Sequence, residues 1–124
     1  MPRTVVISQP VPAVTRQDVE RVVARDFPSS RAREVVSILD EYQGDDAHHG
    51  SDRVRLAALK LAAGDIERLR AAIGMARRDC RDVLALAEYP EYSRSVRPSA
   101  DLSPAERQRI VEADWRQYSE WLTR

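Results

Sequence analysis

The sequence predicts an all-α protein, built from five helices in a bundle or stack that follows an extended N-terminal arm. Apolar residues recur at intervals of three and four positions through most of the chain, which is the spacing of one buried helix face. Capping residues precede several of these segments, and no alternation of strand and helix patterns indicates a parallel sheet. Because 124 residues is close to the usual size of one folding unit, we expect residues 1–124 to form a single domain.

The composition restricts the classes of function. The chain has 20 basic and 20 acidic side chains and a formal net charge of +0. This balance argues against a membrane surface or a nucleic acid as partner, since both usually require a basic excess. No apolar run approaches the roughly 20 residues that cross a bilayer. The single cysteine, Cys80, excludes an internal disulfide and suits the reducing cytoplasm, where we expect the protein to be located.

The N-terminal segment and the first helix are separated by a capping signal. Residues 1–14 are expected to be an extended arm, because their prolines interrupt regular structure and a lone strand has nothing to pair with. A helix is predicted over 15–27, where Thr15 caps the start and Asp18 stands three residues later. Its buried face is expected to consist of Val19, Val22, Val23 and Phe27.

Two shorter helices are predicted next. The segment 30–43 has a serine cap at Ser29 or Ser30, and its apolar residues follow one face. The segment 51–63 carries apolar residues on nearly every side. A helix of that kind is enclosed by other helices, so we expect it at the centre of the fold.

The segment 66–89 is predicted to be one unbroken helix. Its apolar stripe consists of Ile66, Leu69, Ile73, Ala76, Cys80, Val83 and Ala87. Only Gly74 weakens the pattern, at a cost of about 1 kcal/mol. The sequence therefore predicts a rigid rod about 36 Å long, given a rise of about 1.5 Å per residue.

The last helix, 104–122, has a strong start signal. Ser103 and Glu106 form a capping box, with a proline at the first helical position. Residues 90–103 before it are expected to be an exposed loop. Arg107 and Asp114 project into the apolar arc of this helix, where we expect a mutual ion pair or a bond from Asp114 to a tyrosine hydroxyl.

One helix pair resembles a known repeat family. The stretch DRVRLAALKLA (52–62), preceded by EVVSILDEY (34–42), is similar to the helices of a HEAT or armadillo repeat, although no second copy follows at the usual spacing of about 40 to 47 residues. The chain is also similar to small bacterial proteins of unassigned function with endings like RDVLALAEYP. The repeat likeness implies a right-handed α–α superhelix that presents a groove to a protein partner.

The segment 45–52 concentrates side chains that bind metals. Asp46, His48, His49 and Asp52 carry imidazole and carboxylate groups, which suit zinc, nickel or iron. Adjacent histidines point apart, however, and none of the strong metal-binding spacings is present. A polar loop whose acids cap the following helix is the alternative to a metal-dependent small enzyme.

Three arginines share one edge of the predicted rod. Arg70, Arg77 and Arg81 project within about 40° of one another, which suits a phosphate or an acidic partner. Acidic residues three or four positions away can pair with them. The stripe is therefore either a charge-laced exposed face or a site for an anion or nucleic acid. Cys80 has no base near it in the sequence, and we interpret it as a small core residue rather than a nucleophile.

The opposite flank of the rod is apolar. Its residues are Ala71, Met75, Leu86 and Tyr89. A helix that is apolar on two sides is either enclosed or in contact with a partner. Because the chain carries no phosphate-binding loop and no catalytic motif, we predict no cofactor. The sequence favours a non-enzymatic interaction or assembly module that binds another protein or a second copy of itself.

Overall fold

The computed structural model describes residues 11–43, 50–95 and 102–124. In this part of the chain the structure is helical, with no strand, which confirms the all-α class. It contains seven α-helices and one 3-10 turn where the sequence predicted five helices. The elements are α1 (Arg16–Asp26), η1 (Ser29–Arg31), α2 (Ala32–Asp40), α3 (Ser51–Ala62), α4 (Ile66–Arg78), α5 (Cys80–Glu88), α6 (Pro90–Ser95) and α7 (Pro104–Thr123).

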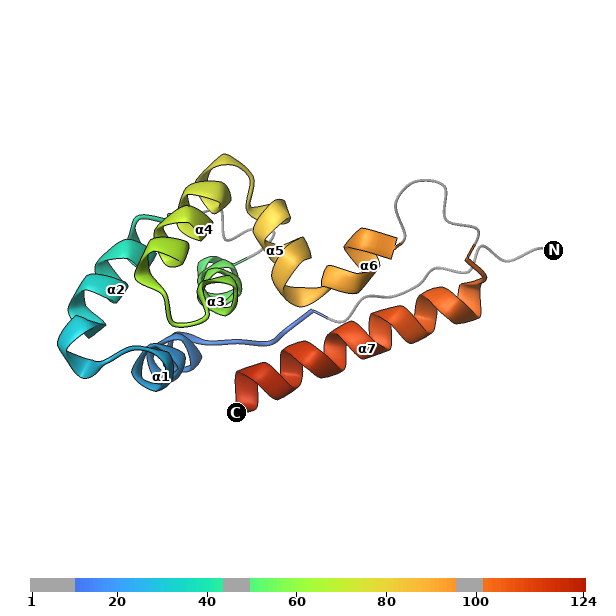
Figure 1. The fold of residues 1–124 in the computed structure, drawn as a ribbon, viewed down its shortest axis with the longest axis horizontal. Helices are drawn as coiled ribbons and strands as arrows, with labels where there is room; N and C mark the ends of the chain where they lie inside the picture. Colours follow the sequence, from blue (N-terminus) through green and yellow to red (C-terminus); the bar gives the residue numbers. More distant parts are fainter. Residues whose placement is uncertain (1–10, 44–49, 96–101) are drawn as a thin grey trace.

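Helix α3 lies at the centre, as its all-round apolar pattern predicts. It packs against α1, α4 and α5 (Figure 1). Its fully enclosed apolar residues are Val54, Leu56, Ala57, Ala58, Leu59 and Ala62. Helices α1, α4 and α5 therefore surround this helix, while α2 packs on α1 and α4, and α7 packs on α5 and α6.

The first helix begins where its capping signal predicts. The backbone N–H of Thr15 donates to Asp18 Oδ2 at 2.9 Å, and this bond lowers the pKa of the Asp18 carboxyl. Val19, Val22, Val23 and Phe27 are all buried. Most of the predicted arm, residues 1–10, lies outside the described residues.

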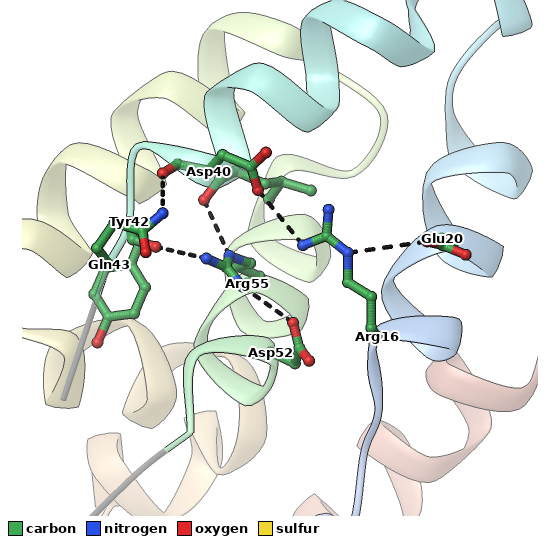
Figure 2. Close-up of polar contacts among 8 residues, drawn as sticks. Arg16, Glu20, Asp40, Tyr42, Gln43, Asp52 and Arg55 are labelled. Atoms are coloured by element: carbon green, nitrogen blue, oxygen red, sulfur yellow. Dashed lines mark hydrogen bonds and ion pairs between the residues drawn. The ribbon is translucent and has the colours of Figure 1, made fainter. Parts of the chain in front are cut away.

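Helix α2 is shorter than the predicted 30–43. It follows a 3-10 turn and ends at Asp40, and Arg55 of α3 donates to carbonyl groups at and just beyond this end. Arg55 Nε donates to the Leu39 carbonyl at 3.1 Å, and Nη2 donates to the Tyr42 carbonyl at 2.8 Å (Figure 2). A buried cation at the C-terminal end of a helix satisfies groups that the helix cannot pair itself.

The predicted rod over 66–89 is wrong. The chain bends at Asp79, which has extended backbone angles, ends α4 and caps α5 by accepting the Arg81 N–H at 3.0 Å. Gly74 stays inside α4. A straight rod would overhang α3, whose 12 residues span only about 18 Å at about 1.5 Å per residue. The bend lets both α4 and α5 pack against α3.

The predicted loop 90–103 begins with a helix, α6. Pro90 at its first position ends α5 and starts α6, because proline cannot continue a helix but fits the first turn. Asp114 of α7 supplies the hydrogen bonds at this end. Its two carboxylate oxygens accept the Glu91 N–H at 3.1 Å and the Tyr92 N–H at 2.8 Å.

Helix α7 starts at the predicted capping box, with the Glu106 N–H donating to Ser103 Oγ at 3.1 Å. It runs beside α6 and α5, and its C-terminal end returns to α1 (Figure 1). There Arg25 donates to the Trp121 carbonyl at 2.7 Å and lies 5.2 Å from the centre of the Trp121 ring. No helix in the described ranges combines the length and apolar character that crossing a bilayer requires.

A buried ion pair joins α3 to α5. Arg53 binds Glu88 through two bonds, from Nε at 2.8 Å and from Nη2 at 2.6 Å. Glu88 holds the pKa of Arg53 above its ordinary value. Gln117 of α7 donates to the carbonyl groups of Ala87 and Glu88 on the same helix end. These polar contacts set the position of α7 relative to α5.

Candidate functional site

The bend at Asp79 places parts of three helices around one apolar groove, here called the α4–α6 groove. Its volume is about 1060 Å³. Its lining comes from α4, α5, α6 and the residue that links α5 to α6. The residues are Met75, Arg78, Asp82, Ala85, Leu86, Tyr89, Pro90, Tyr92, Ser93 and Arg94.

Three of the four predicted interface residues meet in this groove. Met75 and Tyr89 are half-buried, and Leu86 keeps 48% of its surface exposed. Ala71 is exposed one turn before Met75 and does not line the groove. The flank therefore remains accessible although the rod is bent.

Tyr89 and Tyr92 form the end of the groove near α6. Their rings stand edge to face, with centres 6.4 Å apart. Ser93 Oγ donates to the Ala85 carbonyl at 3.3 Å, which fixes α6 against α5. Burial raises the pKa of Tyr89, and the charge of Glu88 adds to that effect. The sequence did not assign Tyr92 to this surface, because Pro90 indicates a helix stop, whereas the structure forms a short helix whose Glu91 and Tyr92 N–H groups donate to Asp114.

The charges of the groove are of both signs. Among the described residues, Arg78 and Asp82 form no ion pair or side-chain hydrogen bond. Arg94 is paired with Glu91. Helical spacing alone did not assign Arg78 or Asp82 to this surface, although each stands three or four residues from a predicted interface residue.

The predicted arginine stripe is divided between two helices and paired with acids. Arg70 lies 3.8 Å from Glu34 of α2, and Arg77 lies 4.0 Å from Glu41, which caps the C-terminal end of α2. Arg81 binds Asp79 at 2.9 Å. These pairs are largely exposed, where solvent screening leaves each a small contribution to stability. Their geometry ties α4 to α2.

Only part of the predicted metal-binding segment lies within the described residues. Asp46, His48 and His49 lie outside the described residues. Asp52 accepts a bond from Arg55 Nη1 at 3.1 Å, and so orients the arginine that caps α2 (Figure 2). Within residues 11–43, 50–95 and 102–124, no group of three possible metal ligands occurs.

Cys80 does not occupy the mid-helix core position that the rod implied. It is the first residue of α5 and is half-buried, in contact with the edge of the core. The apolar stripe on either side of it survives the bend, since Ile73, Ala76, Val83 and Ala87 are all buried.

A second groove, of about 900 Å³, lies between α1, α3 and α7. It contains Lys60, the only lysine of the chain, together with Arg25, Asp26 and Arg124. Burial lowers the pKa of Lys60; Asp114 opposes this shift and Arg124 adds to it. Arg25 and Asp26 neutralise each other at 2.8 Å.

Comparison of the chain with family models, with curated protein sequences and with solved structures finds no match. The likeness to HEAT and armadillo repeats consequently stays a prediction.

Proposed function

We propose that this chain is a non-enzymatic helical module for protein–protein interaction, and that the α4–α6 groove is its docking surface. The observation that carries the proposal is the meeting of Met75, Leu86 and Tyr89, predicted from one helical flank, in a single groove with Tyr92. Apolar grooves bounded by tyrosine and arginine are typical of the energetically dominant parts of protein interfaces.

The stacking of the helices supports the same proposal. Helix α1 packs against α2 and α3, while α4 packs against α2 and α3. Two successive helix pairs that stack in this way match the arrangement of α–α repeat proteins, which bind partners along extended grooves. A right-handed superhelix of the HEAT or armadillo kind is therefore part of the proposal, as is a cytoplasmic location, for which the single cysteine is the support.

Selection from a displayed random-peptide library tests the docking function. The wild-type chain, immobilised at low density, is expected to select peptides with apolar anchors, and Leu86→Asp is expected to abolish their binding. Val11→Asp changes an exposed apolar residue outside the groove and serves as the matched control. Peptides that bind both variants equally, or no enrichment at all, would contradict the proposal.

A further inference from the structure

The outer flank of α4 and α5 has a nearly palindromic order of residue types about the bend. The residues, in chain order, are Ala71, Met75, Arg78, Asp82, Leu86 and Tyr89. Two apolar residues and a cation precede the bend, and an anion and two apolar residues follow it. The positions of Arg78 and Asp82 are symmetric about residue 80, and so are those of Ala71 and Tyr89.

This order is complementary to itself. When two copies of the flank lie antiparallel across a twofold axis beside Cys80, each Arg78 faces the Asp82 of the other copy. Met75 then faces Leu86, and the small Ala71, which lies just outside the groove, faces the large Tyr89. A twofold interface requires one surface to be self-complementary in this way, because both partners contribute the same residues.

The charges of the groove favour a second copy of the same flank over a strongly acidic or strongly basic partner. Arg78 and Asp82 form no ion pair with the described residues, so both are available to a partner. Arg94 is already neutralised by Glu91, and the chain as a whole has a formal net charge of +0. The groove therefore favours a surface with one anion and one cation between apolar residues, which is what the same surface offers after rotation.

We propose that the partner in the α4–α6 groove is a second copy of this chain, held by two reciprocal Arg78–Asp82 ion pairs at the centre of the interface, with apolar residues on both sides of them. This inference rests on the proposed function, since it names the occupant of the same docking surface. Apolar burial supplies the attraction, and the two ion pairs determine the register of the two copies.

Charge exchange followed by sedimentation equilibrium tests the proposal. The wild type is expected to reach twice the 14.1 kDa of one chain as its concentration rises. Arg78→Glu and Asp82→Arg each place like charges together twice, and each is expected to weaken dimerisation about tenfold or more. Mixed in equal amounts, the two variants place opposite charges together at both contacts, so a heterodimer of nearly wild-type affinity is expected.

The controls separate misfolding from loss of association. Arg33→Glu alters an exposed arginine on α2 and should leave dimerisation unchanged. Recovery of the dimer in the mixture shows that both charge variants are folded. Leu86→Asp should give a monomer with unchanged helicity by circular dichroism.

The outcomes also separate this inference from the docking function. If the wild-type chain remains monomeric at about 1 mM, the proposal that the partner is a second copy is wrong. The docking function still stands in that case if peptides that depend on Leu86 are selected. A dimer that survives Leu86→Asp overturns the inference, because association then occurs elsewhere. Failure of the mixed variants to associate, while the wild type dimerises, overturns the reciprocal pairing.

Discussion

Single buried polar groups in this protein differ in how well their surroundings satisfy them. Asp114, only 3% exposed, accepts two backbone hydrogen bonds, so both of its carboxylate oxygens have donors inside the fold. The hydroxyl of Tyr118 is equally buried but has no hydrogen-bond partner in the described part of the chain. Burial raises the pKa of Tyr118, with the charge of Glu88 adding to the effect and Arg53 opposing it.

We expect Tyr118→Phe to change the free energy of unfolding by less than about 1 kcal/mol at neutral pH, because the lost hydroxyl leaves no partner unsatisfied. In the wild type the unfolded chain loses the phenolic proton near pH 10.0, while the folded chain retains it. The stability contributed by the raised pKa is therefore complete below that pH and is lost as the pH rises toward the folded pKa. Tyr118→Phe should accordingly resist alkaline unfolding better than the wild type, as measured by urea unfolding at neutral pH and above pH 10.0.

Tyr89→Phe is the control for that prediction, since Tyr89 is less buried and should have a smaller alkaline effect. A loss of more than about 2 kcal/mol at neutral pH in Tyr118→Phe would show that the hydroxyl is bonded after all.

At the scale of elements, the bend between α4 and α5 determines the shape of the groove. The continuous apolar stripe predicted a single helix because its spacing is preserved through Asp79. The apolar stripe carries no information about the length of α3, which is the helix that α4 and α5 must cover. The signal that marks the bend is Asp79 itself, a residue that favours the N-cap position.

Asp79→Ala is expected to destabilise the protein by about 1 kcal/mol, within the range of roughly 0.5–2 kcal/mol for the loss of an N-cap residue. Asp65→Ala is a matched comparison, because Asp65 caps α4 through the Arg68 N–H at the same 3.0 Å. Glu67→Ala, on the exposed face of α4, should have little effect. An increase of helicity and of stability in Asp79→Ala would mean that the chain prefers a straight rod.

For the whole molecule, the ion pair between Arg53 and Glu88 links the central helix to the end of α5, where α6 and α7 attach. The side chain of Glu88 is 4% exposed and that of Arg53 is 13% exposed. Removal of one member of such a pair leaves a buried charge without compensation, which is costlier than the loss of an exposed pair.

We expect Glu88→Gln to destabilise the fold by about 3 kcal/mol, the lower part of the range for broken buried pairs, since Arg53 keeps some contact with solvent. The double variant Arg53→Met with Glu88→Leu should cost less than the sum of its single changes, because no charge remains buried. A cycle of urea unfolding measurements on the four proteins checks this. If the changes in the free energy of unfolding of the two single variants add up to that of the double variant, the two side chains do not stabilise each other.

Much of the candidate site was predictable before the structure. Met75, Leu86 and Tyr89 follow from helical spacing alone, because the period of a helix assigns residues to faces. Tyr92 joins the groove through bonds between α6 and Asp114, 22 residues further along the chain, which no local pattern contains. Arg78 and Asp82 were not assigned to the interface because a charged residue on a helix surface is ordinary until its surroundings are known.

The sequence by itself determined the all-α class, the capped starts of α1 and α7 and the central place of α3, because these depend on local propensity and on the period of apolar residues. Only the tertiary structure decided the end of α2, the bend of the chain at Asp79 and the formation of a helix rather than a loop after Pro90. Each of these depends on a contact between distant segments: Arg55 with the α2 carbonyl groups, α3 with two helices of greater combined length, and Asp114 with the α6 N–H groups. Local sequence specifies which residues are able to form a helix, whereas packing and long-range hydrogen bonds select where each helix ends.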